Sequence, residues 1–337
     1  MSDEEGEDSQ LAEHRTGKRV ASPVPTMQQF TKKTKVTKAF DWKVTIATPQ
    51  TFKILLTIMT RVLSQCPFQV LKNDKFTGLR VDSMDSSMVC MIKASFECQV
   101  ETNVDLTSES FCIVTDMLCI LLKDVQPGHI LELTRFSDSP DLCLSAFDKE
   151  DDSNRFTFYL SILEDDNRAE RLRMEDITYK YMVEIDLARL KGLCKIAQEI
   201  NASHLNFKID EALIADGGRR HLFFTIGAAG EGASMEKIHH SVTAAEEEGD
   251  EKTIEFAIRA IALEKTADFL ELQENVQGRY DEVFSTTYLN LVLKSMERSS
   301  VNLYMSAGLP LVIKYSLGND SSCVQIVLAP RVREADQ

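Results

Sequence analysis

The chain has 337 residues, 43% of them hydrophobic and 27% charged, and its formal net charge is −15. This composition is typical of a globular protein, and no apolar run approaches the ~18 residues of a membrane-spanning helix. The acidic N-terminus lacks the apolar stretch of a secretory signal. Eight cysteines are scattered through apolar runs without a CxxC pair, so we expect reduced, buried thiols, no metal site and no cofactor.

Charge is distributed unevenly along the chain. Residues 1–13 hold six acidic residues and no basic one, whereas residues 15–38 hold seven basic residues and no acidic one. We expect 1–38 to be a disordered tail. Its stretch GKRVASPVP is either solvated chain or a signal for nuclear import or phosphorylation. Residues 39–337 carry 31 basic and 47 acidic residues. Such a body binds nucleic acid only if its basic groups gather on one surface.

Two interruptions divide this body. The stretch EDDNRAERLRMED (164–176) is typical of a charged linker, and residues 228–252 are typical of a glycine-rich acidic loop. We therefore predict a tail at 1–38, a first domain at 39–163, a connecting linker at 164–178, a second domain at 179–333 and a tail at 334–337.

Four segments have helical periodicity. The first, TPQTFKILLTIMTRVL (48–63), begins with Thr48 as a candidate N-cap and Pro49 at the first helical position. The others are SESFCIVTDMLCILLK (108–123), which is apolar all round, DLARLKGLCKIAQEI (186–200) and STTYLNLVLKSME (285–297).

Short β-type runs fill most of the remaining body. They include HILELTRF (129–136), DLCLSAFD (141–148), RFTFYLSI (155–162), SVNLYMS (300–306) and LPLVIKYS (309–316). Each half thus holds two helices and many antiparallel strands. This order predicts an α+β protein with an internal duplication of one helix-plus-sheet unit.

The outward faces of the predicted helices carry basic residues in an otherwise acidic protein. They are Lys53, Arg61, Lys123, Lys191, Lys195 and Lys294, with Asp116 as the main acidic exception. We expect these helices to share one basic surface. It lacks exposed aromatic residues for stacking on single-stranded bases, so the pattern favours the phosphate backbone of duplex DNA.

Two long motifs resemble the eukaryotic sliding clamp, proliferating cell nuclear antigen (PCNA). GLRVDSMDSSMV (78–89) resembles its SMDSSHV signature, and the stretch from FSTTYLNLVLKSMERSS to VLAPR (284–331) resembles its last domain. The resemblance covers about residues 40–333, although 100–275 is only weakly similar.

The resemblance implies a homotrimeric ring with two similar domains per subunit, helices lining the hole, sheets outside, and duplex DNA passing through. Lys53, Lys123, Lys195 and Lys294 match basic positions of the family, and Arg61 lies one residue beyond such a position. Ile54, Ile120 and Gly192 stand where the family commonly has Lys or Arg, so fewer charges are expected to line the hole here.

The SMDSS-like turn borders, in the family, an apolar pocket that receives client peptides through one aliphatic and two aromatic residues. The positions that the resemblance assigns to this pocket are Met84, Met88, Val89, Leu172, Met174, Tyr179, Pro310, Leu311, Val327, Leu328, Ala329 and Pro330. Met88 replaces a common His. The implied partners are duplex DNA, DNA polymerase, the clamp loader and other proteins with PCNA-interacting peptides, but no membrane.

Other interpretations of single motifs are weaker. A catalytic role for Asp85-Ser86-Ser87 lacks a positioned base and a GxSxG elbow, and GAAGEG (227–232) lacks the Lys of a P-loop. His239-His240 near Glu246–Glu248 is a weak metal candidate. We expect no enzyme activity.

Three hypotheses follow. The first is a nuclear (or viral) sliding clamp and processivity factor. The second is a specialised relative, such as a checkpoint-clamp subunit or a monomeric processivity factor. The third is a metal-dependent nuclease, for which the sequence offers no set of metal ligands. For the clamp, we expect 155–163 to pair with a strand near 221–227 of a neighbouring subunit.

Overall fold

The computed structural model describes residues 39–106, 109–151, 155–163, 179–213, 220–242, 256–260, 280–297, 299–318 and 321–331. The chain falls into two units, 1–38 and 39–337, and every described residue belongs to the second. The predicted tails and the linker at 164–178 lie outside the described residues.

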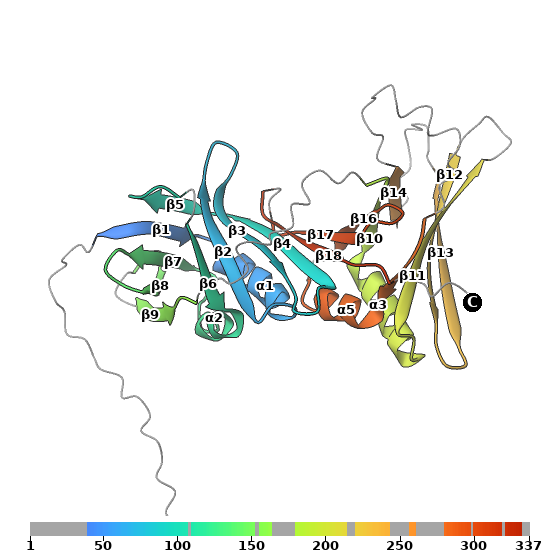
Figure 1. Cartoon of the computed structure of the whole chain (residues 1–337), viewed down its shortest axis with the longest axis horizontal. Coiled ribbons are helices and arrows are strands. Elements are labelled where there is room, and N and C mark those ends of the chain that lie inside the picture. Colours follow the sequence, from blue (N-terminus) through green and yellow to red (C-terminus); the bar gives the residue numbers. More distant parts are fainter. Residues whose placement is uncertain are drawn as a thin grey trace, which may run out of the picture. The chain divides into compact units, whose positions relative to one another are not determined.

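Four helices are found among the described residues, in the four segments that the periodicity indicated (Figure 1). They are α1 (Pro49–Thr60), α2 (Thr115–Leu121), α3 (Leu187–Glu199) and α5 (Thr286–Leu293). Pro49 opens α1 as predicted, but Thr48 makes no side-chain capping bond. Asp186 and Ser285 cap α3 and α5 through the backbone N–H groups of Arg189 and Tyr288.

The second predicted helix is wrong over its first half. Residues 110–114 form a strand, and the helix begins only at Thr115. Because Phe111, Cys112 and Ile113 are all buried, this run has no polar face, and periodicity alone does not separate a buried strand from a buried helix.

The strands form three antiparallel sheets. The five-stranded sheet has the order β5-β1-β7-β8-β9. Its strands are β1 (Phe40–Ile46), β5 (Gln99–Thr102), β7 (His129–Phe136), β8 (Asp141–Asp148) and β9 (Phe156–Ser161). The four-stranded sheet has the order β13-β12-β11-β15. Its strands are β11 (His204–Leu213), β12 (Arg220–Ala229), β13 (Ser234–Val242) and β15 (Tyr280–Ser285).

The nine-stranded sheet has the order β14-β10-β16-β17-β18-β4-β3-β2-β6. Its strands are β2 (Gln65–Lys72), β3 (Thr77–Met84), β4 (Cys90–Glu97), β6 (Ser110–Val114), β10 (Tyr181–Asp186), β14 (Phe256–Ala260), β16 (Ser300–Met305), β17 (Leu311–Ser316) and β18 (Cys323–Leu328). The predicted loop at 228–252 is wrong at its start, because residues 234–242 form β13 and pair with β12.

The described elements repeat once along the chain. Residues 40–161 contain a strand, a helix, five strands, a helix and three strands, and residues 181–328 contain the same order. The pairings repeat as well. β1 lies between β5 and β7 as β10 lies between β14 and β16, and β2 lies between β3 and β6 as β11 lies between β12 and β15. The predicted duplication is therefore visible in both element order and strand pairing.

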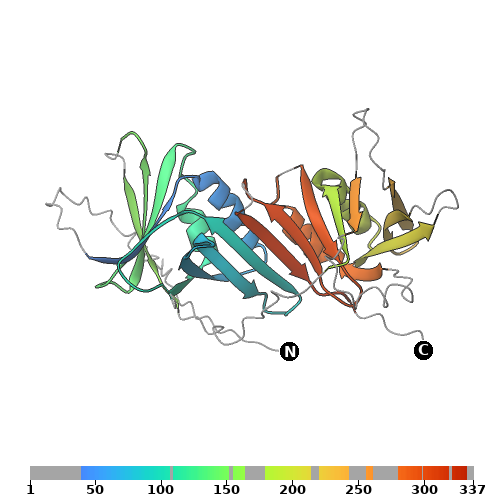
Figure 2. The same ribbon diagram turned by 90° about the horizontal axis from the view of Figure 1, so that it is seen from above.

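The two halves meet within one sheet. β18 of the second half pairs with β4 of the first half along six residues, from Cys323↔Ser95 to Leu328↔Cys90. Figure 2 shows these strands side by side, β18 in red and β4 in teal. Each half also has its own aromatic core. Phe68 and Trp42 stack on Phe111 in the first half, and Phe224 stacks on Phe207 in the second.

Candidate nucleic-acid interface and peptide-binding surface

The helices pack in two pairs, α1 with α2 and α3 with α5. The six predicted DNA-facing residues all lie on these helices or at their ends. The structure separates them into residues held by contacts within the chain and residues directed to solvent.

Lys53 and Lys191 belong to the first group. The Lys53 ammonium on α1 donates to the carbonyl of Val125 at 2.6 Å and to that of Lys123 at 3.3 Å. Burial lowers the pKa of Lys53, and nearby Asp124 raises it in part. The Lys191 ammonium on α3 donates to the carbonyl of Met296 at 2.6 Å.

Arg61 and Lys195 are exposed but partnered. Arg61 Nε donates to Ser295 Oγ at 3.2 Å and so joins the end of α1 to the end of α5. Lys195 Nζ lies 3.7 Å from a carboxylate oxygen of Glu199, one turn along α3. Both side chains of this ion pair are more than half exposed, and such pairs contribute little to stability.

Lys123 and Lys294 are exposed at the ends of α2 and α5. Neither ammonium has a partner among the described residues. Asp116, Asp124, Glu199 and Glu297 also lie exposed on or beside the helices, so the surface carries more acid than Asp116 alone. These four exposed acids equal in number the exposed bases Arg61, Lys123, Lys195 and Lys294, so the described helix surface has no excess of exposed basic residues.

The turn after β3 is organised by Asp85, which is 9% exposed. Its carboxylate accepts from the backbone N–H groups of Val89 at 2.9 Å and Cys90 at 2.7 Å, and from the hydroxyl of Tyr288 at 2.6 Å. Ser87 also donates to it. These hydrogen bonds hold the Asp85 carboxylate in place and stabilise the turn. The Ser87 hydroxyl contacts the Asp85 carboxylate and the Tyr288 hydroxyl. Among its described contacts there is no histidine that would activate it as a nucleophile.

An apolar row crosses the nine-stranded sheet next to this turn. The registers place neighbouring residues opposite one another: Met84↔Met91, Met91↔Val327, Val327↔Val312 and Val312↔Tyr304. Alternation along each strand places these side chains on the face opposite the main core. They form a small cluster of their own with Tyr179. We call these six residues the apolar row.

Tyr179 closes one end of the apolar row. Its ring lies 6.2 Å from that of Tyr304 in an edge-on arrangement. The Tyr179 hydroxyl is buried without a hydrogen-bond partner among the described residues, and burial raises its pKa.

Only some of the predicted pocket residues lie in the apolar row. Met84, Tyr179 and Val327 belong to the apolar row. Near it, the Ala329 N–H donates to the Val89 carbonyl at 2.9 Å; Pro310 and Pro330 are half-buried. Met88 is 71% exposed with φ of 56°, a conformation that non-glycine residues rarely adopt. Leu172 and Met174 lie outside the described residues.

Leu311 and Leu328 require a correction. They pair with each other across β17 and β18, and their side chains are buried in the main core. Their neighbours Val312 and Val327 point to the opposite face. The residues that sequence reasoning missed are Met91, Val312 and Tyr304. The available signal was that Met91 and Val312 share a strand face with Lys93 and Lys314, two residues further on.

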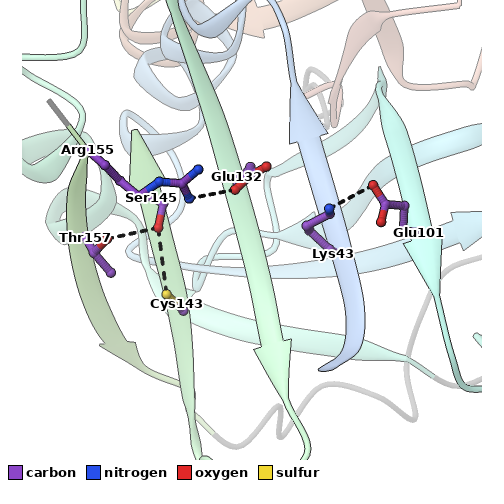
Figure 3. A network of polar contacts seen from close by, with 7 residues as sticks. All are labelled: Lys43, Glu101, Glu132, Cys143, Ser145, Arg155 and Thr157. Atoms are coloured by element: carbon purple, nitrogen blue, oxygen red, sulfur yellow. Dashed lines mark hydrogen bonds and ion pairs between the residues drawn. The ribbon is translucent and has the colours of Figure 1, made fainter. Parts of the chain in front are cut away.

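Among the described residues, the sheet edges are β5, β6, β9, β13, β14 and β15, and two of them, β9 and β13, lie at ends of the five-stranded and the four-stranded sheet. β9 pairs only with β8, and β13 pairs only with β12 among the described residues. Figure 3 shows how the β9 edge is held. Thr157 shares a hydrogen bond with Ser145 at 3.1 Å, and Arg155 donates to Glu132 at 3.0 Å. Exposed apolar side chains lie on both β9 and β13, Tyr159 at 65% and Ile238 at 59%.

The strand at 221–227 is not an edge, contrary to the expected pairing with 155–163. β12 is already paired on both sides, by β11 and β13. The edge strands of that sheet, among the described residues, are β13 and β15.

The described residues contain no group of three or more His, Cys, Asp and Glu arranged to hold a metal ion. The side chains of His239 and His240 are not among those described. No described helix is long and apolar enough to cross a membrane. The cysteines are free thiols, and burial raises the pKa of Cys90 and of Cys194 to about 12.

No family model matches the sequence, and no curated protein matches it. The fold does have a match in the crystal structure of PCNA from Thermococcus kodakaraensis, with a TM-score of 0.63 and 15% sequence identity. The match covers 86% of this chain and 100% of that chain. At this identity the likeness concerns the fold alone. The chain therefore has a fold like that of the PCNA clamp.

Proposed function

We propose that the protein is a DNA sliding clamp. Three subunits form a closed ring around duplex DNA, and the ring tethers DNA polymerase and other proteins with PCNA-interacting peptides, after a clamp loader places it on DNA. The protein performs no chemistry itself; it raises processivity by keeping its clients at high effective concentration. We place this activity in the nucleus, or at the replication site of a DNA virus.

The observation that carries the proposal is the pairing of β18 with β4 between the two halves. In the duplication, β18 corresponds to β9, and β4 corresponds to β13. Among the described residues, β9 and β13 are the strands that lack this partner within one chain. If the same junction repeats between chains, β9 of one subunit pairs with β13 of the next. Repetition of a head-to-tail junction produces a ring when the rotation closes.

Duplex DNA is the ligand best matched by the helix surface. Its exposed amines, Lys123, Lys195 and Lys294, lie on different helices and suit scattered phosphate contacts without base readout. The many acids elsewhere discourage other attachment of DNA. A surface with few fixed contacts suits a protein that moves along the duplex.

Client peptides would occupy the apolar row. Four of its six members are methionine or tyrosine, and methionine adapts to different partners at low cost. Tyr179 packs its ring edge-on against Tyr304 at the end of the row. It is also the first described residue after the predicted linker.

The first experiment is the solution mass by light scattering across a dilution series. One subunit has a mass of 38.0 kDa, so a closed trimer gives about 114 kDa. We expect this mass to hold on dilution. Ile238→Asp, which adds a charge to the β13 edge, should shift the mass toward that of a monomer. Val104→Asp, at an exposed valine just after β5, is the matched control and should leave the mass unchanged.

A stable monomer of the unsubstituted chain would rule out the homotrimeric ring. It would favour the specialised relative, which assembles with other subunits or binds DNA alone. A trimer whose mass is unaffected by Ile238→Asp would instead show that the subunits meet elsewhere.

A further inference from the structure

The same lysine contact occurs once in each half. Lys53 is the fifth residue of α1, and Lys191 is the fifth residue of α3. Each ammonium crosses to the end of the other helix in its half and donates to a backbone carbonyl at 2.6 Å. The duplication has therefore kept a contact as well as an element order.

The receiving carbonyls are also equivalent. Val125 lies two residues after Lys123, and Met296 lies two residues after Lys294. In both halves the N–H of the receiving residue closes a turn by donating to a leucine carbonyl three residues earlier, at 3.1 Å. The sequences LLKDV (121–125) and VLKSM (292–296) carry this turn. In each case, an exposed lysine lies two residues before the residue whose carbonyl accepts the bond from the Lys53 or Lys191 ammonium.

The hydrogen bonds from the Lys53 and Lys191 ammonium groups to these carbonyls are stronger than ordinary neutral hydrogen bonds. An ammonium donating to carbonyls at a helix C-terminus makes a charge-assisted bond that the helix dipole favours. Lys53 also bonds the carbonyl of Lys123 itself, at 3.3 Å. A DNA phosphate would have to break these bonds and leave carbonyls unsatisfied. Lys53 and Lys191 are therefore poorly placed to contact DNA, although both were predicted to do so.

We infer that Lys53 and Lys191 are positioning residues that hold the exposed Lys123 and Lys294 toward the DNA backbone. This inference rests on the proposed sliding-clamp function. Under this inference, Lys123 and Lys294 contact the DNA phosphates. Lys53 and Lys191 instead fix the turns that carry those two lysines.

The test measures binding of the full chain to a fluorescent DNA duplex by anisotropy as a function of salt. The variants are Lys53→Met and Lys123→Met, alone and combined, with Lys294→Met as the matched background in the other half. Methionine keeps most of the aliphatic stem and removes the charge. Thermal unfolding of each variant is followed at the same protein concentration.

We expect Lys123→Met to lower the salt slope by about one unit for each lost phosphate contact, with an unchanged melting temperature. Lys53→Met should lower the melting temperature, by on the order of 5 °C, and weaken DNA binding. In the Lys123→Met background, Lys53→Met should weaken binding no further. In the Lys294→Met background, it should still weaken binding as it does in the unsubstituted protein.

Two results would overturn the inference. If Lys53→Met lowers affinity and slope equally in every background, Lys53 contacts phosphate itself or acts only through overall stability. If it leaves binding unchanged in every background, it does not position Lys123. Failure of the proposed function is a different result, because the unsubstituted protein then shows no salt-dependent binding to duplex at all.

Discussion

The hydroxyl of Tyr288 on α5 donates a hydrogen bond of 2.6 Å to the carboxylate of Asp85 in the turn after β3. This contact joins residues 203 positions apart, one in each half of the chain. Asp85 shapes the turn beside the apolar row, and Tyr288 lies on α5, whose C-cap residue is Lys294. The two proposed functional surfaces are thus connected through one side-chain pair.

Tyr288→Phe should lower the free energy of unfolding by about 1.5–3 kcal/mol, because it removes a hydrogen bond to a charged group. Tyr304→Phe is the matched control, since no contact of the Tyr304 hydroxyl is found among the described residues, and its effect should be close to zero. Denaturant unfolding at a fixed protein concentration measures both. Equal effects of the two variants would mean that the Asp85–Tyr288 bond adds no stability.

Stability should fall in acid through Asp85. Burial alone raises the pKa of Asp85, but hydrogen bonds from Ser87, Tyr288 and the backbone of Cys90 and Val89 outweigh it. The pKa therefore lies below its ordinary value of 3.8. The ionised group stabilises the fold, and this contribution is complete above the unfolded pKa and is lost as pH falls through the lower folded value.

The measurement for this prediction is the unfolding free energy of the unsubstituted protein and of Asp85→Asn from pH 7 down to about pH 3. The advantage of the unsubstituted protein should stay constant down to about pH 5 and then shrink. A constant advantage throughout would show that Asp85 does not titrate with a lowered pKa.

Met91→Lys should weaken binding of client peptides, and because Met91 is 4% exposed it should also lower the free energy of unfolding. Met91 lies in the middle of the apolar row, between Met84 and Val327, and a charge there would be desolvated by a bound aromatic residue. The assay is fluorescence titration with a labelled peptide carrying one aliphatic and two aromatic anchors. We expect a loss of at least about tenfold in affinity, or roughly 1.4 kcal/mol.

Met117→Lys is the control for this experiment, because Met117 is an exposed methionine on α2, away from the apolar row. Its affinity for the peptide should match that of the unsubstituted protein. Retained binding by Met91→Lys would place the client site elsewhere.

Gly192→Lys should strengthen DNA binding. Gly192 lies within α3 with no atom within 4 Å of a Cβ built there, so a side chain fits and points outward. The new charge should steepen the salt slope by about one unit for each new phosphate contact.

Gly192→Ala separates charge from helix propensity. It should raise the free energy of unfolding by about 0.5–1 kcal/mol and leave the salt slope unchanged. If the alanine variant steepens the slope as much as the lysine variant, the charge at position 192 is not the cause.

Local sequence determined much of the fold. Strands 129–136 and 141–148 end at the predicted residues, because apolar residues in them alternate with polar ones or are bounded by turn residues. Pro49 marks the start of α1 for a local reason, its fixed φ. The helix predicted over 108–123 was wrong in its first half, because a fully buried run has no alternation of apolar and polar residues from which to read a period.

The candidate sites depended more on contacts between distant residues. Lys53 and Lys123 look alike in the sequence, since both are basic residues on predicted outward faces. Only the packing of α1 against α2 brings the Lys53 ammonium to the Val125 carbonyl and leaves Lys123 exposed. Likewise, Leu311 and Val312 are adjacent apolar residues, and the register of β17 decides which one faces the core.

The sequence by itself determined the elements, their repetition and the uneven distribution of charge, because these follow from short-range patterns of side chains. The tertiary structure decided which strands lie at sheet edges, which residues form the apolar row, and which lysines are hydrogen-bonded to backbone carbonyls of the same chain. Those properties arise from strand register and helix packing, which bring together residues far apart in the sequence.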